Sequence, residues 1–217
     1  DHQSSSSIAI VRRVDASTGI ITTFAGGGIS APAEGLTATQ ASLSGLAGLS
    51  SDPSGNVYFT LDGPGQVFRV DAATGLLRHL AGSGARGLDG TGIPATGATL
   101  ATLGPAAADP SGNVYFRENG VIGGLGVVRI RRIDAATGIL TTTRTGSLSG
   151  LAVDTAGTVY YTFNDRIWTL LNVPFAGTVN SGFSGDGGPP LSARFDLPVT
   201  LASGGASNVY RFDMGNG

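Results

Sequence analysis

Short apolar segments alternate with polar, glycine-containing turns along almost the whole chain. Residues 57–59 (Val-Tyr-Phe) and 139–142 (Ile-Leu-Thr-Thr) are typical, because each follows a cluster of turn-forming residues. β-Branched and aromatic residues favour extended backbone, whereas Gly, Pro, Asp and Asn favour turns. No long segment repeats apolar residues at the 3.6-residue spacing of an amphipathic helix. The pattern therefore predicts an all-β protein built of hairpins, with few helices.

Two hairpin sequences recur in alternation. The first has the turn Asp-Pro-Ser-Gly-Asn followed by Val-Tyr-Phe, and the second has Arg and an apolar residue before Asp-Ala-Ala-Thr-Gly. In the first turn Pro presets φ and Gly takes the position that needs a positive φ. Copies of the first lie at residues 52–59, 109–116, 154–161 and 205–210, and copies of the second at 13–20, 69–76 and 132–139, with a degenerate fourth near 171–178.

The order of the hairpins predicts a ring. The chain begins with the second type and ends with the first, and 217 residues divided by four gives units of about 54 residues. A β-propeller closes when both termini contribute strands to one blade, which removes open strand edges. We therefore predict a β-propeller of four four-stranded blades, with the C-terminal hairpin (201–212) paired to the N-terminal hairpin (8–24). This single domain spans residues 8–217, after a Ser-rich arm at residues 1–7.

The repeated motifs resemble the NHL repeat. The resemblance rests on Gly-Leu-Ala-Val-Asp-x-x-Gly-x-Val-Tyr at residues 150–160, on residues 131–138 and on the loop Gly-Phe-Ser-Gly-Asp-Gly-Gly-Pro at 182–189. It covers residues 8–213 and implies a β-propeller, usually of six blades. This chain has only four repeats, so either the ring is small or the chain is part of a larger assembly.

Composition narrows the possible partners. Charged residues make up 13% of the chain, the net charge is −2, and all 13 basic residues are Arg, which argues against a nucleic-acid binder. No apolar run approaches the roughly 20 residues that span a bilayer. There is no Cys, which excludes disulfides and Cys-ligated metal. The low charge and the abundance of Ser, Thr and Gly favour a secreted or cell-surface protein.

Three long connections carry the candidate binding residues. Residues 26–44, 82–104 and 177–198 are each about 20 residues long, and loops of that length often bind something. We expect them on one face of the ring. The residues selected there as a binding site are Arg86, Asp89, Phe183, Asp186 and Arg194. No cofactor is expected; calcium at the Asp89 or Asp186 loop is the alternative to the simpler interpretation that both carboxylates cap their loops.

Little in the sequence indicates catalysis, and no catalytic or metal-binding residue is predicted. His2 and His79 are too few for a typical zinc site, and the Gly-rich segment 82–87 precedes no helix that could hold a dinucleotide. The acids of the repeated turns mark structural positions, and Glu118 is one of four acids scattered outside them. Repeated Arg residues on the third strands, such as Arg131 and Arg132, are interpreted as a solvated face paired with the turn acids.

These observations favour an extracellular, non-catalytic propeller that binds a protein or glycan or acts as a scaffold. An alternative is a structural subunit that self-assembles into a surface fibre by exchanging terminal strands with other copies. A lyase or hydrolase is the third alternative. The expected partner is a protein, a glycan or another copy of the chain, and neither nucleic acid nor a membrane span is expected.

Overall fold

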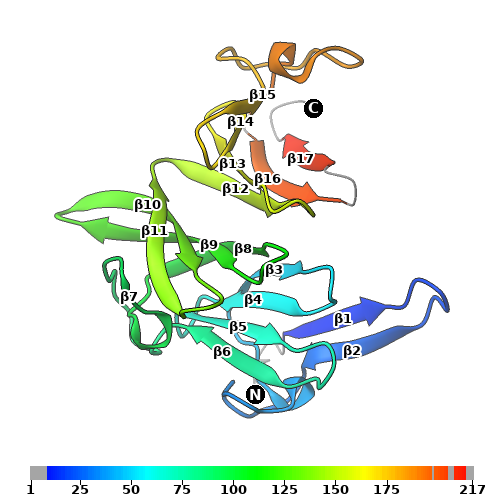
Figure 1. Ribbon diagram of the computed structural model, residues 1–217, viewed down its shortest axis with the longest axis vertical. Coiled ribbons are helices and arrows are strands. Elements are labelled where there is room, and N and C mark those ends of the chain that lie inside the picture. The colour runs from blue at the N-terminus through cyan, green and yellow to red at the C-terminus, as the bar shows by residue number, and fades with distance from the viewer. Residues whose placement is uncertain (1–8, 197, 205–207, 214–217) are drawn as a thin grey trace, which may run out of the picture.

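The computed structural model describes residues 9–196, 198–204 and 208–213, so the predicted Ser-rich arm lies outside the described residues. Within them, regular structure is almost entirely β-strand (Figure 1). The exceptions are three single-turn 3-10 helices, one in each long connection: η1 (Ala38–Gln40), η2 (Ala95–Gly97) and η3 (Pro190–Ser192). The prediction of an all-β chain with minor helices is confirmed.

The strands form antiparallel sheets that follow one another along the chain. The first pair is β1 (Ile10–Val14) with β2 (Ile21–Gly26). The next sheet runs β3 (Leu46–Ser51), β4 (Val57–Leu61), β5 (Gln66–Val70) and β6 (Leu77–Ala81). The third runs β8 (Thr102–Ala108), β9 (Val114–Ile122), β10 (Leu125–Ile133) and β11 (Ile139–Thr145), with the short β7 (Ile93–Pro94) on its outer edge.

Two further sheets complete this series of five sheets, which we call the arc. One contains β12 (Leu148–Val153), β13 (Val159–Phe163), β14 (Arg166–Thr169) and β15 (Pro174–Ala176). The last contains only β16 (Pro198–Ser203) and β17 (Val209–Asp213). Apart from β7, which pairs with β11, the strands of each sheet pair in sequence order, as in the blades of a propeller. The hairpins predicted from the repeats are therefore present, and the fold is propeller-like.

The repeated acids hold the turns between strands. Asp52 accepts hydrogen bonds from the Asn56 backbone N–H (3.0 Å), the Asn56 side-chain amide (2.8 Å) and the Tyr58 hydroxyl (2.9 Å). Gly55 occupies the tight turn between them with a φ of +82°, which disfavours any side chain. In the second type of turn, Asp71 accepts from the backbone N–H groups of the two residues before Gly75. The structural interpretation of these acids is confirmed.

The two types of turn are also joined to each other. The Asn56 side-chain oxygen accepts a 2.9 Å hydrogen bond from the backbone N–H of Ala72. In the next sheet, Asn113 accepts equivalent bonds from Ala135 (3.0 Å) and from the Arg132 guanidinium (2.9 Å). In each of these two sheets one Asn therefore fixes the first turn against the second.

Apolar packing lies mainly between neighbouring sheets. One buried cluster joins Tyr58 and Val67 to Phe116 and Leu140 of the next sheet, and another joins Tyr115 and other residues of that sheet to β12 and β13. Tyr160 and Tyr161 are likewise buried in such clusters. Each sheet is therefore stabilised by the sheets on either side of it.

The ends of the chain do not close the ring as predicted. Within the described residues, β1 pairs only with β2, and β17 pairs only with β16. The two hairpins lie well apart in Figure 1, where β17 is near the top and β1 near the lower right. The predicted pairing of residues 201–212 with residues 8–24 is therefore wrong for this structure, and the count of four blades is not confirmed. Hairpin order specifies strand neighbours within a sheet, but it does not fix the curvature of the arc.

Candidate functional site

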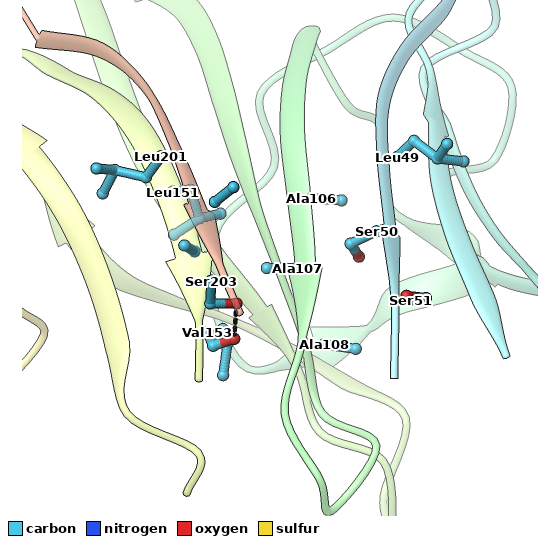
Figure 2. A pocket seen from close by; sticks show the side chains of 12 residues that line it. Leu49, Ser50, Ser51, Ala106, Ala107, Ala108, Leu151, Val153, Leu201 and Ser203 are labelled. Carbon is cyan, nitrogen blue, oxygen red and sulfur yellow. Dashed lines mark hydrogen bonds between the residues drawn. The ribbon is translucent and has the colours of Figure 1, made fainter. Parts of the chain in front are cut away.

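Four successive sheets surround a cavity of about 250 Å³ with one edge strand each, namely β3, β8, β12 and β16, which we call the inner strands (Figure 2). β3, β8, β12 and β16 each contribute three consecutive residues to it. These residues are Leu49, Ser50 and Ser51; Ala106, Ala107 and Ala108; Leu151, Ala152 and Val153; and Leu201, Ala202 and Ser203. We call this space the axial cavity.

The sequence places Ser, Ala, Val and Leu at this position in the repeats. Each triplet comes immediately before the first type of turn. Side chains no larger than Leu leave the cavity open. The lining therefore follows from the repeat, but its location was missed because the triplets are about 50 residues apart and none contains a titratable side chain.

The axial cavity offers backbone donors and acceptors as well as hydroxyl groups. Each inner strand has a strand partner on one side only, so its other edge presents backbone N–H and C=O groups without a partner strand. Ser203 donates from Oγ to the Val153 carbonyl (2.5 Å), linking the last two inner strands (Figure 2). The Ser50 hydroxyl is shielded from solvent and has no hydrogen-bond partner within the described residues.

A second cavity of about 220 Å³ adjoins the first beside the turns. It shares Ser51 and Ser203 with the axial cavity and is also lined by Asp52 and Asp154. Asp154 accepts from two turn N–H groups and from the Tyr160 hydroxyl, in the same way as Asp52 does with its own turn. These carboxylates are therefore committed to the turns. Burial, followed by the hydrogen bond to Asp52, raises the pKa of Tyr58 to about 12, so that its hydroxyl stays protonated at neutral pH.

Two of the residues predicted to bind, Arg86 and Asp89, lie in the second long connection. Arg86 donates to Asp62 (3.1 Å) and to the Ala101 carbonyl (2.5 Å). The Asp89 carboxylate accepts from the Thr99 backbone N–H (2.6 Å), which confirms its interpretation as a loop cap. Both side chains help to fold their own connection.

The other three predicted residues lie in the third long connection. Phe183 is 69% exposed. The backbone N–H of Arg194 donates to the carbonyl of Ser184 (3.0 Å), two residues before Asp186. In Figure 1 this connection is at the top of the arc, away from β7 and the second connection. The five residues thus form two groups rather than one site, and their role in binding stays a prediction.

The Arg residues of β10 do not all form a solvated face. Arg132 pairs with Asp134 at the turn (2.7 Å), as predicted. Arg131, however, exposes no side-chain surface and donates to Glu118 (2.8 Å), which is equally buried; Arg129 also donates to Glu118 (3.0 Å). The prediction of a solvated stripe is wrong for these two residues, and Glu118 is not an isolated acid.

Within the part of the chain that the structure describes, no group of three or more His, Cys, Asp or Glu side chains is arranged to hold a metal ion. No helix there is long and apolar enough to cross a membrane. The chemistry available at the axial cavity is therefore hydrogen bonding by strand edges and hydroxyls.

No protein-family model and no curated protein matches the sequence. Solved structures do match. A gluconolactonase from Xanthomonas campestris has a TM-score of 0.54 at 12% identity, over 90% of this chain and 60% of that structure. Virginiamycin B lyase from Staphylococcus aureus has a TM-score of 0.46 at 16% identity, over 94% and 56%. A streptogramin B lyase has a TM-score of 0.47 at 17% identity, over 78% and 48%.

These comparisons correct the predicted function. The likeness in fold to the gluconolactonase contradicts the interpretation as a non-catalytic binding module or fibre subunit. The chain spans 48–60% of the length of these structures. At such low identity the gluconolactonase likeness establishes the fold, and an NHL-repeat family is not confirmed. The chain is similar to β-propeller-like enzymes.

Proposed function

We propose that this chain is a catalytic propeller that opens a small cyclic ester bound in the axial cavity. The observation that carries the proposal is the convergence of four strand edges on one cavity whose lining side chains are no larger than Leu. The likeness in fold to a gluconolactonase supports a lactone as the substrate class.

The cavity suits a small polar substrate. Its volume of about 250 Å³ equals that of roughly eight water molecules in the liquid, at about 30 Å³ each, which matches a single sugar-sized ring. The exposed hydroxyls of Ser51 and Ser203 are the side-chain groups of the lining that can bond sugar hydroxyls there.

The strand edges supply the electrostatic part of the reaction. Water adds to the ester carbonyl carbon, the ring C–O bond breaks, and the proton released by water passes to the ring oxygen, which leaves as a hydroxyl on the same molecule. Negative charge develops on the carbonyl oxygen during addition, and preorganised backbone N–H groups stabilise such charge. The edges of β3, β8, β12 and β16 carry N–H groups of this kind.

The proposal can be tested by measuring the hydrolysis of glucono-δ-lactone, with and without Ca²⁺. The rate is read from the acid released at constant pH. We expect a saturable rate above the spontaneous hydrolysis. Ser51→Phe and Ala202→Phe, at exposed positions on different inner strands, should each lower kcat/KM at least tenfold by filling the cavity. Ser111→Phe, exposed in the turn before β9 and outside the axial cavity, is the matched control. A native rate equal to the spontaneous rate would overturn the proposal.

A further inference from the structure

The terminal hairpins are complementary halves of one blade. In the complete sheets, the turn acid Asp134 follows the third strand, and the turn residue Asn113 precedes the second strand. β1 precedes the equivalent acid, Asp15, so it is a third strand, and among the described residues it has no second-strand partner. β17 follows the equivalent Asn208, so it is a second strand, and in the same part of the chain it has no third-strand partner. Each open edge therefore has the type of strand that the other edge needs.

The side chains on these edges reproduce a pair that the structure already contains. In the β9–β10 pair, Tyr115 lies opposite Arg132. Glu118 lies two residues after Phe116, which is the residue opposite Arg131, and it accepts a hydrogen bond from Arg131. Counted from the shared motifs, Arg12 and Arg13 of β1 correspond to Arg131 and Arg132, and Tyr210 and Asp213 of β17 correspond to Tyr115 and Glu118. In the register known from β9–β10, Arg211 of β17 would lie directly opposite Arg12, and Asp213, two residues further along, would be the carboxylate near both guanidinium groups.

Asp213 also has the local setting of Glu118. Glu118 accepts a 2.9 Å hydrogen bond from the backbone N–H of Ala101, just before the inner strand β8. Asp213 accepts a 3.0 Å bond from the N–H of Asp196, just before the inner strand β16. Asp213 also pairs with Arg211. With Arg12 added, one carboxylate would be shared by two guanidinium groups, as Glu118 is shared by Arg129 and Arg131.

A groove beside β1 marks where the missing hairpin fits. It has a volume of about 600 Å³ and is lined by β1, β2, the inner strand β3 and the turn that follows it. Leu49 of β3 is 52% exposed, whereas its counterparts on β8, β12 and β16 (Ala106, Leu151 and Leu201) are only 4–6% exposed. The difference arises because β3 has no inner strand before it along the arc.

Apolar side chains are also exposed on both hairpins. Val14 and Ile10 of β1 and Tyr210 and Phe212 of β17 are each 44–61% exposed. Their counterparts in β9 and β10 include Ile133 and Tyr115, which are buried. Burial of such side chains stabilises association by roughly 25 cal/mol per Å² of apolar surface.

We propose that a second copy of the chain occupies this groove. The β16–β17 hairpin of one copy inserts beside β1 of the other, β17 pairs antiparallel with β1, and Asp213 binds Arg12 of the second copy. Because the two edges lie apart in one chain (Figure 1), the pairing is between chains. Reciprocal insertion closes a ring of two copies, equivalent to eight blade units, which is within the range of known propellers. This proposal does not depend on the proposed function.

Solution mass and cysteine cross-linking test the pairing. Light scattering should give about 43 kDa, twice the chain mass of 21.7 kDa. The chain has no Cys, so single-cysteine variants cross-link only where they are designed to. Arg13→Cys on one tagged chain and Tyr210→Cys on another occupy positions equivalent to the directly opposed Arg132 and Tyr115. Strand partners lie within disulfide reach, so mixing the two variants under mild oxidation should give a mixed disulfide.

The control replaces Arg13→Cys with Thr18→Cys, which is exposed at the tip of the β1–β2 turn and out of register with Tyr210. This mixture should cross-link at least tenfold less. Val14→Asp puts a charge where the counterpart Ile133 is buried, so it should weaken association at least tenfold; Val14 is 61% exposed in the single chain, so the circular dichroism spectrum should stay unchanged. A 21.7 kDa particle at all concentrations would overturn the proposal. So would a disulfide within one chain in the Arg13→Cys/Tyr210→Cys double variant, which would indicate closure of each chain on itself.

Discussion

Arg131 donates a 2.8 Å hydrogen bond to Glu118, and neither side chain exposes any surface to solvent. The same guanidinium donates to the backbone carbonyls of Asp89 (3.0 Å) and Gly90 (2.6 Å) in the second long connection. Burial lowers the pKa of Arg131, and the adjacent Glu118 carboxylate opposes that shift. One buried ion pair thus attaches a long surface connection to the middle of a sheet.

Removal of the buried carboxylate should therefore be costly. Glu118→Gln leaves Arg129 and Arg131 without a counter-charge, and breaking a buried pair in this way destabilises proteins by about 3–5 kcal/mol. The measurement is the free energy of unfolding in urea. Glu34→Gln, which removes an exposed pair with Arg78, is the matched control and should cost about 1 kcal/mol or less. Equal losses for the two variants would contradict the role assigned to Glu118.

Asn113 should be a second sensitive position. Its side chain donates to Asp109 (2.8 Å) and accepts from the Ala135 N–H and Arg132, so Asn113→Ala separates two turns. We expect a loss of about 1–3 kcal/mol, the usual cost of leaving such groups unsatisfied. This loss can be measured by thermal unfolding of Asn113→Ala. The control is Ser111→Ala, which changes an exposed turn residue and should alter stability little. A loss no larger than that of Ser111→Ala would show that the turns hold without the bridge.

The raised pKa of Tyr58 predicts that the protein loses stability at alkaline pH. Its pKa is about 12 in the folded protein, against about 10 for an unfolded chain. The folded state thus favours the neutral phenol, so this contribution is fully present below pH 10 and is lost as pH rises from 10 to 12. The Tm should fall over that interval, and Tyr58→Phe, which has no proton to lose, should show a shallower fall. Parallel Tm profiles for the two proteins would contradict the assignment.

The sequence contained enough information to predict the hairpins, because each turn is encoded locally. Asp52, Gly55 and Asn56 form their turn through residues at most six positions apart, including Tyr58. The Glu118–Arg131 pair was not predicted, since it depends on which residues of two strands face each other and on burial by a third segment.

The axial cavity could not be predicted for a related reason. Its lining comes from four distant triplets, and it forms only when the sheets pack side by side. The open ends were mispredicted because the alternation of hairpins is the same whether a ring closes within one chain or between two. The complementarity of Arg12 and Asp213 is visible in the sequence, whereas the distance between them is set by the packing of the three complete sheets.

Binding of a substrate analogue tests directly whether the axial cavity holds the substrate. Gluconolactam, which has an amide in place of the ester and resists hydrolysis, can be titrated calorimetrically into the native protein, Ser51→Phe and Ser111→Phe. We expect saturable binding to the native protein and to Ser111→Phe, with at least tenfold weaker binding to Ser51→Phe. Binding of equal strength to all three proteins would place the ligand outside the axial cavity and contradict the proposed site.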